Sequence, residues 1–351
     1  MLIFDAHLDL AYNAVDWNRD LEWSIAELRG AEAGMTTLGR QTATVTLGEL
    51  RTAGIGLCVA TLCARQEPKV DHGFGRITKE GCYAAAMAHR EYYRAQERRG
   101  LMRIVTTKSQ LQQAYAEYET KPDTAPLSFV LSMECADAVL DPSHVFDWYA
   151  QGVRAIGLTH YGVNRYGGGT NTEVGLFPEA FELLRNMEQL GMVLDLTHLS
   201  DPSFDQAVAN FGGRIVASHQ NARKWANWQR QFSDDQIRAV IARDGVIGAA
   251  CDAIMLQEGW VRGVSKPEVT IDRVVDNIDY VCQMAGNCRN AGIGTDLDGG
   301  YGYEQPPADL NTIADLRRIP DLLERRGYSA DDIRSILHGN WIRLYSESLP
   351  D

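Results

Sequence analysis

Short apolar segments alternate with longer amphipathic segments along most of the chain. Eight apolar segments have the length and composition of buried parallel strands, at residues 2–4, 56–61, 127–133, 153–158, 193–196, 215–218, 246–249 and 291–294. Between and after them lie helix-like segments, at residues 78–99, 178–190, 202–211, 310–326 and 330–347. This alternation predicts an α/β fold in which helices join parallel strands.

Eight strands with crossover helices predict a closed (β/α)8 TIM-like barrel, although an open, doubly wound sheet has the same local pattern. Residues 16–50 fit neither the strand nor the helix pattern, and we interpret them as an insertion after the first strand that helps to wall a site. We find no linker rich in glycine, serine or proline and no internal repeat. Barrels of this kind often reach the length of this chain, so we expect residues 1–351 to form one domain.

The charge balance excludes some classes of partner. Acidic residues exceed basic ones by 47 to 34, which gives a formal net charge of −13. This charge repels a phosphate backbone or an anionic membrane surface, and no basic cluster offsets it locally. We therefore expect neither a nucleic-acid partner nor a membrane partner.

The expected compartment is the cytoplasm. The first residues lack the basic and long apolar regions of a signal peptide, and no apolar segment approaches the ~18–20 residues that cross a bilayer. The seven cysteines are an odd number, and several lie in apolar segments where cysteine acts as a small core residue. A core of this size does not need disulfides, which favours a reducing environment.

Side chains with metal-binding or catalytic chemistry follow six of the eight predicted strands. They are His7 and Asp9, Glu134, His160, His198, His219 and Asp296. In a barrel all of these positions lie at the C-terminal mouth, where such enzymes build their sites. One strand-end histidine or aspartate is usually structural or a helix cap, but the joint placement favours a functional site. We interpret the other four histidines as structural or solvated: His72, His89, His144 and His338.

The spacing of these residues predicts two metal ions. His7 and Asp9 are two apart on an extended segment, so they face the same side and can bind one ion. His198 and His219 end neighbouring strands and can bind a second, and Glu134 can bridge both. Imidazole and carboxylate ligands suit Zn²⁺, although the same set also takes Mn²⁺, Co²⁺ or Fe²⁺. Two such ions can activate water for the hydrolysis of an amide.

The same strand ends carry motifs that resemble the membrane (renal) dipeptidase family, within the amidohydrolase-like barrels. Each motif is weak alone, but their order and spacing together are specific. The resemblance implies a dipeptidase that accepts a free C-terminal carboxylate, with L,D-dipeptides among its substrates. It implies the same five metal ligands: His7, Asp9, Glu134, His198 and His219. The matching segments are residues 5–9, 132–134, 158–160, 190–198, 218–223, 294–299 and 339–341.

The resemblance also implies roles for three further residues. His160 matches a histidine that stabilises the oxyanion, and Arg230 matches an arginine that binds the substrate's terminal carboxylate. Asp296 matches the acid near the activated water, placed to accept its proton or to bind the substrate's free amine. Arg223 is a rival for the carboxylate. Asp298 is interpreted as support for the site or as a turn former. The expected catalytic residues are Asp296, His160 and Glu134.

Two departures from the family pattern concern the mouth of the barrel. Cys135 follows Glu134 where the family usually has glycine, so the loop there is expected to differ in shape. Residues 161–171 contain three consecutive glycines and are unusual, which leaves the preferred substrate side chains open. Homodimers are common for such barrels, but no apolar stripe identifies an interface.

Other functions remain as alternatives. The first is a related metal-dependent amidohydrolase that acts on N-acyl amino acids or another small amide. A metal-holding binding protein without activity would be expected to lose the water-handling residues, yet Asp296 and His160 are both present. Serine or cysteine hydrolase chemistry is disfavoured, because no Gly-x-Ser-x-Gly motif occurs and Cys58 and Cys63 have no evident histidine partner.

Overall fold

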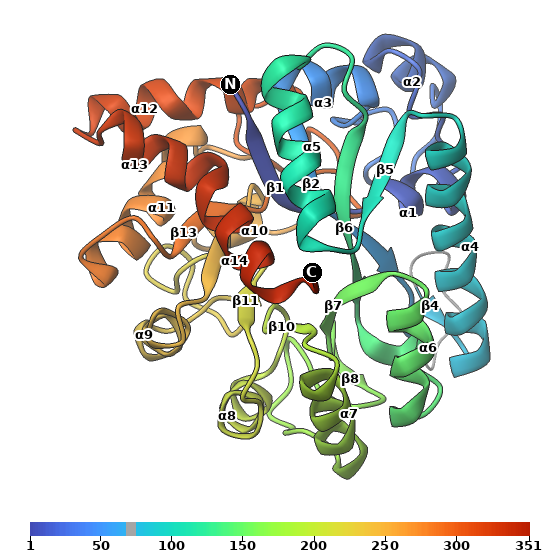
Figure 1. The fold of residues 1–351 in the computed structure, drawn as a ribbon. Coiled ribbons are helices and arrows are strands. Elements are labelled where there is room, and N and C mark those ends of the chain that lie inside the picture. Colours follow the sequence, from blue (N-terminus) through green and yellow to red (C-terminus); the bar gives the residue numbers. More distant parts are fainter. Residues whose placement is uncertain (68–74) are drawn as a thin grey trace.

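The computed structural model describes residues 1–67 and 75–351, and eight of its parallel strands close into a ring (Figure 1). The strands follow one another around the ring in chain order, and the last pairs with the first. Because each strand has a neighbour on both sides, the predicted (β/α)8 barrel is confirmed and the open sheet is excluded. The strands are β1 Ile3–Leu8, β2 Ile55–Cys63, β6 Leu127–Glu134, β7 Val153–Gly157, β10 Val193–Asp195, β11 Ile215–Ala217, β12 Val246–Ala249 and β13 Ala291–Ile293.

The first strand is longer than predicted. It continues to Leu8, so His7 lies within β1 instead of following it. The apolar pattern of residues 2–4 stops at Asp5, but the Asp5 carboxylate is buried and accepts hydrogen bonds from the backbone and hydroxyl of Thr295. Tertiary contacts therefore extend a strand across polar residues that local hydrophobicity would exclude.

Short strands outside the ring were not predicted. Strand β5 (Met102–Val105) pairs with the first half of β6, where β7 does not reach. Two ribbons lie near the mouth: β3 (Arg65–Gln66) with β4 (Gly75–Arg76), and β8 (Val163–Asn164) with β9 (Gly167–Gly168). The four strands of these ribbons have two residues each, too few to produce a periodic signal in the sequence.

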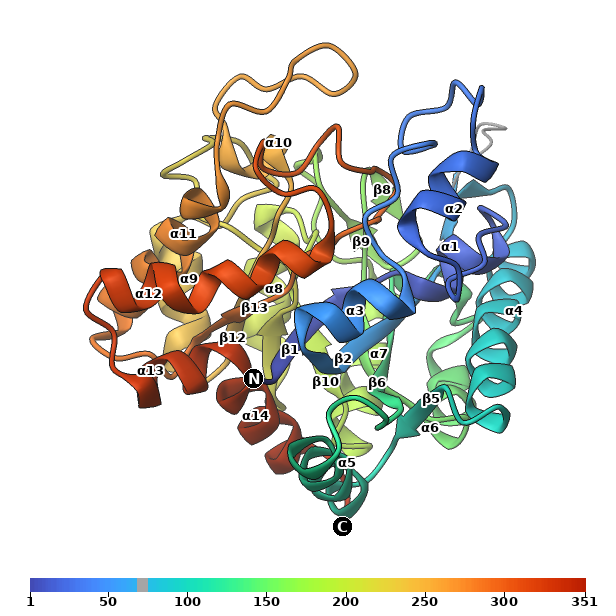
Figure 2. The same ribbon diagram turned by 90° about the horizontal axis from the view of Figure 1, so that it is seen from above.

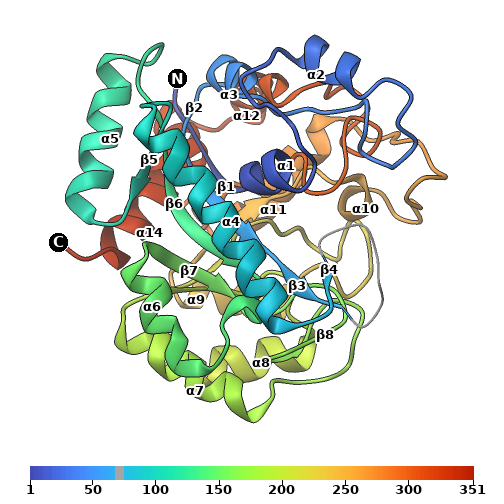
Figure 3. The ribbon, with the colours of Figure 1, turned by 90° about the vertical axis from the view of Figure 1, so that its right-hand side faces the viewer.

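Helices cover the outside of the ring. The predicted helices at residues 78–99, 178–190 and 202–211 are confirmed as α4, α7 and α8, and Figure 3 shows α4 running along the outer surface of the barrel. Among the helices of the described residues, none has both the length and the apolar character needed to cross a bilayer. The crossover helices are α4 Lys79–Arg98, α5 Lys108–Thr120, α6 Val145–Ala150, α7 Pro178–Gln189, α8 Asp201–Asn210, α9 Asp234–Ala242, α10 Ala253–Leu256 and α11 Ile271–Ala285.

Both C-terminal helices are interrupted. The segment predicted at 310–326 begins as a 3-10 turn (Ile313–Arg318) and continues as α12 (Ile319–Arg325), because Pro320 lacks the N–H that a continuous helix needs. The segment predicted at 330–347 consists of α13, a π-helical turn and α14. Their bounds are Ala330–Arg334, Ser335–Gly339 and Asn340–Ser348.

The insertion at residues 16–50 is partly helical. After α1 (Leu10–Val15), it contains α2 (Ile25–Ala31) and the start of α3 (Leu47–Ala53). Ser24 and Glu27 form a capping box at the start of α2, a local signal for a helix beginning there. The helix is short, which explains why no periodicity was visible.

The two ends of the barrel differ. At one end α14 packs on the start of β1, where Phe4 stacks with Trp341 and Tyr345 at centroid distances of 6.2 and 5.9 Å. The indole of Trp341 donates to the carbonyl of Ile293, 3.1 Å away. We call this end the base. Figure 2 shows α5 and α14 at this end and the long loops that follow the strands at the other end, the mouth.

Candidate metal centre

The side chains that were predicted to lie at strand ends are found together at the mouth. Glu134 is the last residue of β6, His7 lies in β1, and the others belong to the segments just after their strands. All seven predicted residues converge on one buried site. Six of them are buried, with relative exposures of 2% for His7, 8% for Glu134 and 1% for His219, and the Asp296 side chain is 14% exposed.

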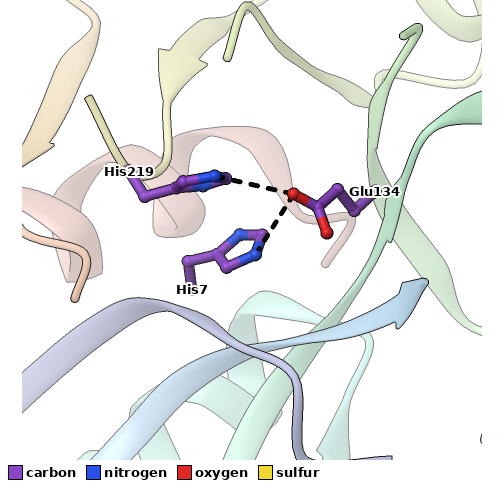
Figure 4. Close-up of side chains that lie close together, drawn as sticks. All are labelled: His7, Glu134 and His219. Carbon is purple, nitrogen blue, oxygen red and sulfur yellow. Dashed lines mark ion pairs between the residues drawn. The ribbon is translucent and has the colours of Figure 1, made fainter. Parts of the chain in front are cut away.

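One oxygen of Glu134 lies at the centre of four imidazoles. Its Oε1 atom is 3.6 Å from Nε2 of His7 and 3.5 Å from Nε2 of His219, as Figure 4 shows. The same oxygen is 3.5 Å from Nε2 of both His160 and His198. Ligand atoms around a tetrahedral ion with bonds of ~2.0–2.1 Å lie ~3.3–3.4 Å apart. The spacing is therefore close to that of donors around a metal.

The second part of the cluster is acidic. Nε2 of His7 lies 3.8 Å from an oxygen of Asp9 and 3.8 Å from an oxygen of Asp296. The thiol of Cys63 donates to the other oxygen of Glu134 at 3.2 Å. The residues form four overlapping groups with metal-ligand spacing, and Glu134 belongs to three of them. The groups are His7–Glu134–His219, Glu134–His160–His198, His7–Asp9–Asp296 and Asp9–Cys63–Glu134.

The acidic groups fit a site that holds cations. Burial raises the pKa of Asp9 to about 6, helped by the charge of Glu134. Burial and the charges of Glu134 and Asp9 also raise the pKa of Asp296 well above its usual range, although His7 opposes this. Three carboxylates so close together in a buried site cost free energy unless cations neutralise them. Divalent ions would supply that charge.

The histidines fit the same interpretation. Burial lowers the pKa of His198 and of His219 well below the usual range, so both rings are neutral and can offer a lone pair. Burial opposes protonation of His7 too, but the charges of Glu134 and Asp9 raise its pKa to about 10. Its buried Nε2 has no hydrogen-bond partner among the described residues, as expected of an atom that faces a metal.

Hydroxyl groups orient three of the four rings. Nδ1 of His198 lies 3.0 Å from the Thr170 hydroxyl, and Nδ1 of His219 lies 2.9 Å from the Ser218 hydroxyl. The Ser218 hydroxyl is also 3.3 Å from Nδ1 of His7. A hydroxyl oxygen can accept a hydrogen bond from Nδ1–H, which keeps the ring proton on Nδ1 and leaves Nε2 unprotonated and directed at Glu134. These three histidines have the arrangement of metal ligands.

Several non-glycine residues at the mouth have positive φ angles, and four of them belong to the site or lie next to its residues. They are His198 at 66°, Asp296 at 60°, Asp298 at 57° and Cys135 at 72°. Such left-handed conformations cost free energy and persist only where surrounding contacts impose them. Cys135 thus keeps the conformation that glycine adopts without strain. The mouth stores strain at the residues that present the site.

Asp298 anchors the insertion. Its carboxylate accepts hydrogen bonds from the backbone of Thr44 and Val45, at 2.9 and 3.0 Å, and lies 3.3 Å from Nη1 of Arg19. Asp298 therefore holds residues 16–50 against the loop that carries Asp296. The described residues of 16–50, interpreted as helping to wall a site, do not line the cavity themselves. The insertion supports the mouth from behind.

A cavity of about 320 Å³ opens beside the cluster. Arg230 lines it and is 3% exposed, and its guanidinium donates to the carbonyl of His219 at 3.0 Å and to Gln220 at 2.6 Å. Arg223 points elsewhere, because it pairs with Asp201 and does not line the cavity. Of the two rival arginines, only Arg230 is placed to meet a ligand here.

Several cavity residues were missed by sequence reasoning. Two of them follow the strands that had yielded no candidate: Arg65 comes after β2, and Asp252 after β12. A search for polar residues that directly follow predicted strands, the criterion used for the other candidates, would have found both. Asp252 is buried, which raises its pKa to about 6, and it accepts from Gln305 at 2.8 Å. Further lining residues without such a signal are Tyr161, Ile254, Met255, Arg262, Gly299, Tyr301 and Gln305.

The remaining histidines lie outside the cluster. His89 is buried and pairs with Asp16 at 2.5 Å, and His338 is buried at the base of the barrel. His144 lies 4.0 Å from the exposed Asp147. These three fit the structural or solvated roles expected of them. His72 lies outside the described residues.

Comparisons with known proteins place the chain in a family. The family model described as membrane dipeptidase (Peptidase family M19) matches residues 1–348. An uncharacterized protein in the pqqA 5′ region of Klebsiella pneumoniae is 30% identical over 205 residues, 56% of this chain and 73% of that protein. For five further curated relatives the matched segment covers only 45% to 57% of their length.

Solved structures share the fold over nearly the whole chain. A structure described as dipeptidase AC, a metallopeptidase of family M19, has a TM-score of 0.79 at 22% identity and covers 100% of this chain and 99% of its own. A metallopeptidase from Rhodobacter sphaeroides, bound to a phosphinate mimic of L-Ala-D-Ala, has a TM-score of 0.77 at 21% identity and covers 99% of both chains. The family match, together with the metal-type cluster, leads to one conclusion: this chain belongs to the membrane dipeptidase family of metal-dependent peptide-bond hydrolases.

Proposed function

We propose that this protein is a binuclear dipeptidase that holds two Zn²⁺ ions and cleaves dipeptides with a free C-terminal carboxylate. The observation that carries the proposal is the grouping of histidines and carboxylates around Glu134. His7 and Asp9 would hold one ion, His198 and His219 the other, and Glu134 would bridge them. Such ions polarise a carbonyl and lower the pKa of water.

The proton transfers are assigned to Asp296. Its carboxylate lines the cavity and lies 3.8 Å from Nε2 of His7, within the cluster. A carboxyl with a raised pKa is suited to take a proton at neutral pH and to give it up again. Asp296 would take the proton of the attacking water and pass it to the nitrogen of the leaving amine.

The substrate would be held by its two charged ends. Arg230 would bind the terminal carboxylate, since its guanidinium is buried in the cavity wall and can donate two parallel hydrogen bonds. Asp252 offers a second buried carboxylate in the same cavity, which suits the free amine of a dipeptide. This pair of opposite charges favours a free dipeptide over an N-acyl amino acid. His160 would donate to the oxygen of the attacked carbonyl.

We include L,D-dipeptides among the proposed substrates. The solved Rhodobacter sphaeroides structure of the same fold holds a mimic of L-Ala-D-Ala, which supports this choice. The seven cysteines are free thiols, which supports the proposed reducing, cytoplasmic location. Fractionation of the source cells tests the location: recovery outside the cytoplasm would contradict it.

The test is the hydrolysis of L-Ala-L-Ala, L-Ala-D-Ala and N-acetyl-Ala by zinc-loaded protein and by its Glu134→Gln variant. We expect cleavage of at least one free dipeptide by the wild type, and loss of that activity in the variant. Zinc analysis of the same samples should give two ions per chain for the wild type. Cleavage of N-acetyl-Ala alone would replace the proposal with the amidohydrolase alternative.

A further inference from the structure

A guanidinium lies against the ring of His160 on the side away from Glu134. Nη1 of Arg65 is 2.7 Å from Nδ1 of His160, while Nε2 of the same ring is 3.5 Å from Oε1 of Glu134. A guanidinium has five N–H donors and no acceptor, and it stays protonated in proteins. Nδ1 must therefore accept the hydrogen bond. The proton of the neutral ring is then on Nε2, the atom that faces the site.

This environment separates His160 from the other histidines. Nδ1 of His198 and Nδ1 of His219 each face a hydroxyl oxygen, which can accept a hydrogen bond from Nδ1–H and so leave Nε2 free for a metal. A metal bond through Nε2 of His160 would require a proton on Nδ1, facing the donors of Arg65. Two donors would then oppose each other at 2.7 Å. His160 is as close to Glu134 as its neighbours are, yet its chemistry is that of a donor.

Arg65 is itself held in place. It lies in strand β3, and its second terminal nitrogen pairs with Glu67. The next backbone N–H, that of Gln66, donates to the buried carboxylate of Asp137 at 2.6 Å. One contact thus holds the guanidinium and another holds the backbone of β3, and only 18% of the Arg65 side chain is exposed. A group held in this way can impose an orientation on its neighbour.

We propose that Arg65 is a positioning residue that sets the tautomer of His160 and aims its Nε2–H into the site. This inference rests on the proposed function, in which His160 donates to the carbonyl oxygen as negative charge develops there. Arg65 acts through His160 and need not touch the substrate. The same contact explains why a fourth histidine beside Glu134 is not a fourth imidazole ligand.

The first measurement is the tautomer of His160 in zinc-loaded protein labelled with ¹⁵N-histidine. Two-bond ¹H–¹⁵N correlation spectra distinguish a proton on Nε2 from one on Nδ1, and a His160→Gln variant assigns the signals. We expect the Nε2–H tautomer in the wild type and in Arg65→Lys, since lysine also only donates. Arg65→Met should lose the preference. A wild-type ring with its proton on Nδ1, or an unchanged ring in Arg65→Met, overturns the proposal.

Kinetics provide the second readout. Arg65→Met should lower kcat about 10- to 100-fold with KM changed less than about threefold, since a mispositioned oxyanion donor acts on the transition state. The zinc content should stay at the wild-type value. Arg65→Lys should recover part of kcat. A rise in KM with kcat unchanged would overturn the proposal, because Arg65 would then be a substrate-binding residue.

The matched control is Arg76→Met. Arg76 lies in β4, the partner of β3, but pairs with Asp16. We expect the tautomer of His160 and the kcat to be unchanged in this variant. Failure of the proposed function is seen separately: if the wild type cleaves no dipeptide, the spectra still decide whether Arg65 sets the proton on His160.

Discussion

The mouth and the base of the barrel both bury histidine, but they use it differently. At the base, His338 packs 5.6 Å from the ring of Tyr115, near the apolar stack of Phe4, Trp341 and Tyr345. At the mouth, four imidazoles surround one oxygen of Glu134. Burial of a histidine is therefore not a sign of function. What distinguishes the mouth is that side chains from all eight barrel strands converge there.

The pKa values of the buried histidines also differ between the mouth and the base. Burial lowers the pKa of His338 to about 4, and burial lowers that of His160 to about 3, so both rings are neutral at neutral pH. His7 differs because the charges of Glu134 and Asp9 outweigh its burial and raise its pKa to about 10. Only the mouth therefore favours a positive charge, and in the working protein metal ions would provide it.

The largest effect is expected from matched histidine substitutions at the two ends. His219→Gln removes a proposed ligand, so zinc content should fall and kcat/KM should drop ~10³-fold or more, since several kcal/mol of transition-state stabilisation are lost. His338→Gln should change neither quantity. The checks are metal analysis and dipeptide hydrolysis on both variants. Equal losses in the two variants would contradict the division between mouth and base.

A substitution at the base should change the free energy of unfolding and not the activity. Trp341→Ala removes a fully buried indole from the stack and should lower the free energy of unfolding by about 3–5 kcal/mol. Activity per folded molecule should remain, because Trp341 packs on Phe4 at the base end of β1, three residues before His7, and contributes no side chain to the cavity. Denaturant unfolding should still show one transition if residues 1–351 form one domain. A lower kcat in the folded fraction would show that the two ends are coupled.

Two arginine variants compare a residue that lines the cavity with one that lies outside it. Arg230→Met should raise KM ~100-fold for a free dipeptide, because one partner of a buried charge pair is removed. Arg223→Met is the matched control, since Arg223 pairs with Asp201 outside the cavity, and it should leave KM unchanged. Steady-state kinetics on L-Ala-L-Ala decide between them. The opposite pattern would transfer the carboxylate role to Arg223.

The smallest expected effect is on the free energy of unfolding at acid pH. Burial opposes ionisation of Glu32, but hydrogen bonds from Arg19 and then Arg40 lower its pKa below the ordinary value of 4.5. Glu32 thus stabilises the folded state above its ordinary pKa, and this contribution is lost as the pH falls through the lowered value. Arg40 is partly exposed and screened, so its share of the effect is small compared with that of the buried Arg19.

The measurement is the difference in unfolding free energy between wild type and Glu32→Gln from pH 7 to pH 3. The difference should shrink on acidification. Glu80→Gln, at an exposed helix start, serves as the control and should show little difference at any pH. A Glu32 difference that persists at pH 3 would contradict the assignment. Because Arg19 also contacts Asp298, loss of the Glu32 charge should loosen contacts at the mouth more than contacts at the base.

Much of the site could be predicted because its signals are local. Apolar periodicity marked the eight strands, and the residues that follow six of them were visible as His, Asp and Glu. Arg65 and Asp252 obey the same rule but were overlooked, because arginine and aspartate are common in loops. The length of β1 was missed because buried hydrogen bonds to Asp5 extend it.

The sequence by itself determined the alternation of strands and helices and the chemistry at the strand ends, since both depend on near neighbours in the chain. The pairing of β1 with β13, which closes the barrel and excludes an open sheet, was decided by the tertiary structure. Only the tertiary structure decided which histidine offers a lone pair and which a proton. That choice depends on the group facing Nδ1. Thr170 and Arg65 come from other segments than the rings they contact, and Ser218, although it neighbours His219, is 211 residues from His7. The tautomer of an imidazole is a property of its partner, and folding brings the partner there.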